Sequence, residues 1–166
     1  MKKPGLTVIA VAIFLAGCAT TPAPQGQETA STKLEWGKVY NVEVLETVED
    51  FGFFNGYMLN SLTGLAGMGI DPALVSSVNG QVRSGLEEQG LLISAGQKID
   101  LSGEILSVSF ADDRALMKAR LQLTDAHNEL PLSTVEVESR APDRARAGEV
   151  LSHAIVEYLS GLLEKE

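Results

Sequence analysis

The sequence is poor in the side chains that metal sites use most. It contains one cysteine, Cys18, and two histidines, His127 and His153. A zinc site needs several closely spaced Cys, His or carboxylate ligands, and neither histidine has such neighbours along the chain. We therefore expect no metal or other cofactor, and we expect both histidines at the surface.

The sequence also lacks the short motifs of common catalytic sites. No serine stands in a Gly-x-Ser-x-Gly frame. The glycine-rich segment Gly64–Gly69 has neither the Lys-Ser/Thr pair of a P-loop nor the preceding strand of a dinucleotide-binding loop. Asp112 and Asp113 lack the alternating oxygen ligands of a calcium loop and are typical of a hairpin turn. The sequence predicts a protein that is not an enzyme.

Basic residues and long hydrophobic runs are scarce as well. The chain has 13 Lys and Arg against 22 Asp and Glu, a formal net charge of −9, which argues against binding to nucleic acid or to anionic headgroups. The apolar run Leu6–Ala16 would rise only about 16 Å as a helix, whereas the hydrocarbon core of a bilayer is ~30 Å thick. This run is therefore too short to span a membrane.

What the N-terminus does contain is an export signal. Lys2 and Lys3 precede the apolar run, and small residues follow it, which is the order of a signal peptide. The next residues, Leu15-Ala16-Gly17-Cys18, resemble the lipobox of bacterial lipoproteins. An ordinary secretory signal is the alternative, but it would leave Cys18 as an unpaired thiol in an oxidising compartment.

The lipobox resemblance implies a location. It implies that residues 1–17 are removed and that acyl chains on Cys18 anchor the mature protein to the membrane. Ala19 after the cysteine implies the outer membrane, with the domain facing the periplasm. Residues 18–33 are rich in Pro and small polar residues and predict a flexible linker, so residues 34–166 form a single domain of ordinary size.

The hydrophobic pattern of that domain predicts alternating strands and two helices. Alternation at 38–46 favours a half-buried strand, and a stripe from Leu74 to Leu86 favours a helix that Asp71 caps and Gly90 ends. Alternation also predicts strands near 98–110, 115–124 and 135–140, with a bulge near Leu106. A broad apolar face from Val150 to Leu162 predicts the last helix.

These elements predict an α+β fold. The order βαβββα suggests a mostly antiparallel, four-stranded sheet with two helices on one face. Lys118 and Arg120 should face Glu136 and Glu138 across neighbouring strands. Gly80 and Gly85 are expected to allow close packing of the first helix against the sheet.

The segment "IDLSGEI…LQLTDAHNELPLSTVEVES", with Gly103 in a strand and Asp125 in a turn, resembles small envelope lipoprotein domains. These include the curli-secretion lipoprotein and the lipoprotein activators of peptidoglycan synthases. The resemblance implies anchoring and binding to another envelope component.

The stretch from Glu49 to Ile70 departs most from what folding alone requires, because it combines many glycines with large apolar groups. We interpret it as a long connection between the first strand and the first helix, either folded over the edge of the core or serving as a binding surface. The candidate partner or ligand surface consists of Phe51, Phe53, Phe54, Tyr57, Met58 and Leu62.

Three functions follow as hypotheses. The first is a lipid-anchored, non-enzymatic accessory or adaptor protein that binds another envelope protein. The second is a domain that binds a lipid or small apolar ligand with its Phe-rich stretch. The third is a subunit of an oligomeric secretion or assembly complex, in which the chain forms a homo-oligomer.

Overall fold

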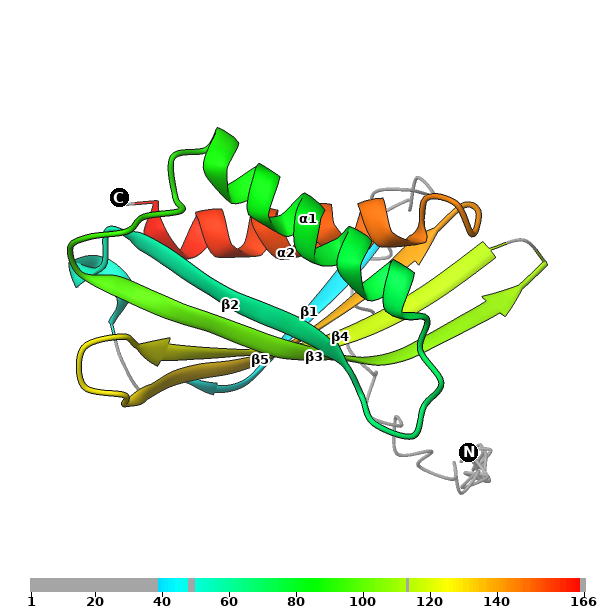
Figure 1. Cartoon of the computed structure of the whole chain (residues 1–166), viewed down its shortest axis with the longest axis horizontal. Helices are drawn as coiled ribbons and strands as arrows, with labels where there is room; N and C mark the ends of the chain where they lie inside the picture. Colours follow the sequence, from blue (N-terminus) through cyan, green and yellow to red (C-terminus); the bar gives the residue numbers. More distant parts are fainter. Residues whose placement is uncertain (1–38, 48–49, 113, 165–166) are drawn as a thin grey trace, which may run out of the picture. The chain divides into compact units, whose positions relative to one another are not determined.

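The computed structural model describes residues 39–47, 50–112 and 114–164. The predicted signal peptide, Cys18 and the linker lie outside these residues and stay predictions. The described residues form an α+β domain in which a five-stranded sheet carries two helices on one face (Figure 1). The predicted fold class is confirmed, and the sheet has one strand more than predicted.

The elements follow one another in the order β1, η1, β2, α1, β3, β4, β5, α2. Their bounds are Val39–Thr47 (β1), Phe51–Phe53 (η1, a 3-10 turn), Gly56–Gly64 (β2), Pro72–Glu88 (α1), Lys98–Ala111 (β3), Arg114–Asp125 (β4), Pro131–Ala141 (β5) and Ala147–Leu163 (α2). The spatial order of the strands is β1-β5-β4-β3-β2. Three neighbouring pairs are antiparallel, and β2 runs parallel to β3.

The fifth strand, β2, corrects the prediction of a long connection between residues 49 and 70. Tyr57 and Leu59 point toward the core, an irregularity of register follows at Asn60, and Leu62 points inward again. The extra residue breaks the two-residue alternation that marks a strand in sequence. Because β2 is parallel to β3, the chain needs a crossover between them, and α1 supplies it.

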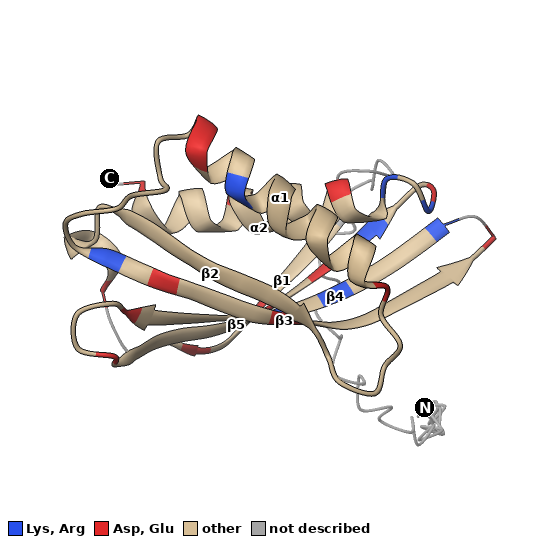
Figure 2. Ribbon diagram, in the orientation of Figure 1, with Lys and Arg blue, Asp and Glu red and all other residues tan. Residues whose placement is uncertain are grey.

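The remaining strands follow the predicted pattern. Val135 and Val137 of β5 are fully buried, and the register of β3 against β4 shifts between Ile105 and Ser107, where a bulge was expected. Arg120 lies opposite Glu136, and Lys118 lies opposite Glu138. Charged residues are interspersed along the strands in the view of Figure 2.

The first helix begins and ends as predicted. Asp71 caps α1, because its Oδ1 accepts a hydrogen bond of 2.8 Å from the N–H of Ala73, and Pro72 is the first helical residue. Gly90 follows the helix with a φ of +68°, a conformation that favours glycine.

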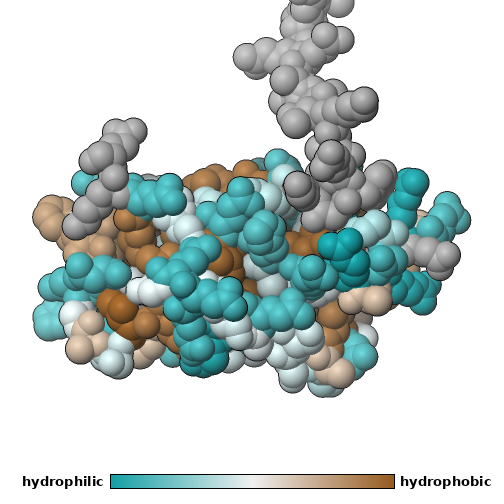
Figure 3. Space-filling view, turned by 90° about the horizontal axis from the view of Figure 1, so that it is seen from above, coloured by the Kyte–Doolittle hydropathy of each residue, from teal (hydrophilic) through white to brown (hydrophobic). Residues whose placement is uncertain are grey.

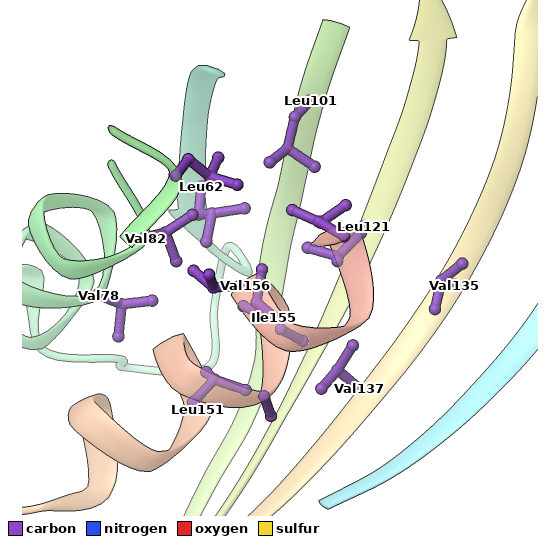
Figure 4. Packing of buried hydrophobic residues seen from close by; sticks show 14 of the residues in the cluster. Leu62, Val78, Val82, Leu101, Leu121, Val135, Val137, Leu151, Ile155 and Val156 are labelled. Carbon is purple, nitrogen blue, oxygen red and sulfur yellow. The ribbon is translucent and has the colours of Figure 1, made fainter. Parts of the chain in front are cut away.

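The core lies between the sheet and the two helices. Leu151, Ile155 and Val156 of α2 lie between the sheet and the apolar side of α1, as Figure 4 shows with Val78 and Val82. Gly85 explains the close approach of the helices, because a Cβ there would lie 2.8 Å from Cγ2 of Val156. The expectation that this glycine packs against the sheet was therefore wrong, and Gly80 has open space around it.

Candidate interaction surface

The Phe-rich stretch divides between the core and the surface. Asp50 starts the short η1 turn by accepting a hydrogen bond of 2.9 Å from the N–H of Gly52. The turn directs Phe51 and Phe54 inward, where their ring centroids lie 6.5 Å apart. Phe53 points outward, and 78% of its surface is exposed.

Tyr57 belongs to the core. It is fully buried, and its hydroxyl donates a hydrogen bond of 2.7 Å to the carbonyl oxygen of Leu159 in α2. Burial raises the pKa of the Tyr57 hydroxyl far above its ordinary value, so the group stays neutral and keeps its donor. This bond ties β2 to the last helix.

Leu62 belongs to the core as well. Its side chain is 1% exposed. Its N–H donates to Oδ1 of Asn79, and its carbonyl oxygen accepts from Nδ2 of the same side chain, both at 2.7 Å. Asn79 of α1 thus takes the place of a neighbouring strand along this part of β2. Met58 is half-buried.

The structure therefore separates the predicted site residues. Phe51, Phe54, Tyr57 and Leu62 lie in the core, and Phe53 is the most exposed of the predicted set. Phe53 is thus accessible at the surface, whereas the four buried residues position the segment that carries it.

Leu130, in the turn between β4 and β5, is a second exposed residue at the same end of the sheet. It is 51% exposed, and it lines an open cavity of about 370 Å³ together with Phe53. The other lining residues are Asp50, Phe54, Gln97, Asp125, Asn128 and Leu132. We call this set the Phe53 end. The sequence analysis did not single out Leu130, although an apolar residue in the polar turn "DAHNEL" was a usable signal.

The turn that carries Leu130 is held by its own side chains. Oδ1 of Asp125 accepts a hydrogen bond of 2.8 Å from the N–H of His127, and Oδ1 of Asn128 accepts one of 3.0 Å from the N–H of Leu130. Glu129 adopts a φ of +60°. These bonds hold the turn in a defined conformation and so fix the position of Leu130.

The outer face of the sheet carries an ion-pair network. Glu136 pairs with Lys118 and with Arg120, whose Nη2 lies 2.6 Å from Oε1 of the glutamate. Hydrogen bonds from Lys118 and then Arg120 hold the pKa of the Glu136 carboxyl below its ordinary value. The network fixes strand register, as the sequence suggested, and offers no unpaired carboxylate for chemistry.

The described residues contain no obvious catalytic or metal centre. His127 is exposed, and His153 lies 3.7 Å from Glu157 on the surface of α2. No group of three or more His, Cys, Asp or Glu side chains could hold a metal ion in the described part of the chain. None of its helices is both long and apolar enough to cross a membrane.

The fold is similar to that of a protein of known structure. No family model and no curated protein matches the sequence. The structure resembles PelC from Paraburkholderia phytofirmans, solved as a dodecamer, with a TM-score of 0.54, 14% sequence identity, and coverage of 77% of this chain and 100% of that chain. A single-substitution variant of the same PelC dodecamer gives the same values. At this identity the likeness shows the fold alone.

Proposed function

We propose that this chain is a non-enzymatic accessory protein of the bacterial cell envelope. Acyl chains on Cys18 hold it at the outer membrane, and its periplasmic domain binds another envelope component. The observation that carries the proposal is the Phe53 end, where Phe53 and Leu130 are exposed beside an open cavity. An exposed aromatic residue next to a hollow with polar groups at its margin is typical of an interface anchor.

A homo-oligomer is the second candidate. PelC, which shares the fold, was solved as a dodecamer. A head-to-tail ring would need two different surfaces on each subunit, and the Phe53 end is suited to be one of them. The apolar-ligand hypothesis, in which the Phe-rich stretch encloses the ligand, has less support, because Phe51, Tyr57 and Leu62 fill the core.

Site-specific photo-crosslinking in intact cells tests the proposal. A photoreactive phenylalanine analogue placed at Phe53 in the full chain should give a reproducible crosslinked product. The matched control places the analogue at Gln81, an exposed position on α1, and should give none. A product with twice the mass of the chain would identify the homo-oligomer, and a larger or smaller increment would identify another protein.

Two results would contradict the proposal. Equal crosslinking at Phe53 and Gln81 would show that the Phe53 end has no specific contact. Replacing Cys18 with Ser should release the protein from the membrane fraction, and an unchanged distribution would contradict the lipid anchor.

A further inference from the structure

Strand β1 is an edge strand whose outer side is open. It pairs with β5 on one side, and among the described residues no segment pairs with its other side. An unpaired strand edge presents a row of N–H and C=O groups that can accept another strand. Natural edges are commonly blocked by proline or lysine, and β1 contains neither.

The side chains of β1 that face the helices are incompletely covered. Val135 and Val137 of β5 are fully buried, but their partners in β1, Val44 and Val42, are not. Val42 is half-buried, and Val44 is 49% exposed. This apolar row lies on the core side of the sheet, so exposure there leaves hydrophobic surface that one more strand would cover.

A hollow lies over this row. Its volume is about 600 Å³, and it is lined by Tyr40 and Val42 of β1 and by residues of α2 that include Val156, Tyr158 and Leu162. Side chains of an added strand that point to the same face would enter the hollow, because residues opposite each other on neighbouring strands share a face. In Figure 3 the visible described residues of the helix side show hydrophobic residues in patches among hydrophilic ones.

The charges around the hollow are mainly acidic. Glu157 and Glu164 line it together with His153, and no lysine or arginine is among its described lining residues. Burial and a hydrogen bond to Glu157 raise the pKa of Tyr40 to about 12, so the tyrosine keeps its proton. Glu43 adds a carboxylate on the opposite face of β1.

We propose that β1 accepts an extended segment of a partner protein as a sixth strand. The segment would carry apolar residues at alternate positions, which enter the hollow, and lysine or arginine residues at the positions between them, which face Glu43 on the opposite face of the sheet. A second copy of this chain fits less well, because the chain carries a net charge of −9. The β1 edge is separate from the Phe53 end, so this inference does not depend on the proposed function.

A synthetic peptide tests the inference on the full-length lipidated protein in detergent micelles. The probe is an acetylated, amidated peptide of alternating lysine and valine, about eight residues long to match a typical strand. Hydrogen exchange of β1 amides should slow about tenfold when the peptide binds. A peptide of alternating glutamate and valine, and a lysine-valine peptide with a central proline, should leave exchange unchanged.

Two variants with matched charge changes sharpen the test. Glu43→Gln removes the carboxylate that the lysines face and should weaken lysine-valine binding about threefold, the scale of one exposed ion pair. Glu149→Gln, on α2 and outside the lining of the hollow, should leave binding unchanged. Val44→Lys places a cation on the apolar row and should weaken binding at least tenfold.

Three outcomes would overturn the inference. These are no slowing of exchange in the β1 amides that point away from β5, slowing confined to another element, or protection of those same amides without peptide. In the last case, sedimentation would show whether a second copy or the chain's own residues occupy the edge. Crosslinking from Phe53 should persist in Val44→Lys, so failure of this inference and failure of the proposed function can be told apart.

Discussion

The two edges of the sheet differ in how the backbone groups of their outer strands are covered. At the β2 edge, the side chain of Asn79 hydrogen-bonds to the N–H and the carbonyl oxygen of Leu62. Residues 91–93 also form a short parallel bridge with Tyr57, whose N–H donates to the carbonyl oxygen of Leu91 at 2.7 Å and whose carbonyl oxygen accepts from the N–H of Ile93 at 3.0 Å. At the β1 edge, the described residues provide no equivalent cover. The chain thus protects the β2 edge with its own side chains and loop, whereas no other described residue covers the outer side of β1.

The largest expected effect comes from placing the same residue at both edges. Leu62→Lys buries an ammonium group at a site that is 1% exposed, and it should lower the free energy of unfolding by more than about 4 kcal/mol. Val44→Lys, at a site that is 49% exposed, should change it by less than about 0.5 kcal/mol. Urea denaturation measures both, and equal losses would show that the β1 edge is covered in solution.

The next effect concerns the loop that covers β2. A Cβ at Gly56 would overlap the carbonyl oxygen of Leu91. Gly56→Ala should therefore displace this loop and lower the free energy of unfolding by about 3 kcal/mol. Gly80→Ala is the matched control, since a Cβ there has open space and alanine favours a helix by about 1 kcal/mol. The midpoint temperature of thermal unfolding should therefore fall for Gly56→Ala and rise for Gly80→Ala.

The side chain of Asn79 gives a smaller effect. Asn79→Leu leaves the N–H and C=O of Leu62 without their partners and should destabilise the domain by about 2 kcal/mol. Gln81→Ala removes only an exposed bond to Ser77 and should cost less than about 0.5 kcal/mol. If Asn79→Leu were as mild as its control, the protection of the β2 edge would not depend on this side chain.

The smallest effect is a pH dependence of the ion pairs between β4 and β5, the strand next to β1. Because the pKa of Glu136 is lower in the folded state than its ordinary value of 4.5, its ion pairs stabilise the fold above that pH. This stability is lost as the pH falls from 4.5 through the folded pKa. Glu136→Gln should give a shallower fall in unfolding free energy over this range, and a slope identical to wild type would contradict the assignment.

Local pattern predicted much of the fold. The cap at Asp71, the alternation of β3 to β5, the bulge near Leu106 and the pairing of Arg120 with Glu136 all depend on residues close in sequence or on a two-residue period. The strand β2 was missed because the extra residue at Asn60 breaks the period and because its glycines are typical of loops. Its parallel pairing with β3 is a long-range contact that no local signal specifies.

The candidate site was predictable only in part. The sequence drew attention to the segment that carries Phe53, but it could not distinguish Phe53 from Phe51 and Phe54, because one 3-10 turn decides which rings point inward. Leu130 joins Phe53 only because η1 and the β4–β5 turn meet at one end of the sheet.

The sequence by itself determined the acidic charge, the single cysteine within a lipobox-like motif, the α+β class and the alternating faces of most strands. Composition and short-range periodicity are sufficient for these properties. Only the tertiary structure decided which two strands lie at the edges of the sheet and which residues cover each edge. Asn79 meets Leu62, and Val44 stays half exposed beside Val135, because the crossover through α1 inserts β2 beside β3 and leaves β1 at the other end of the sheet.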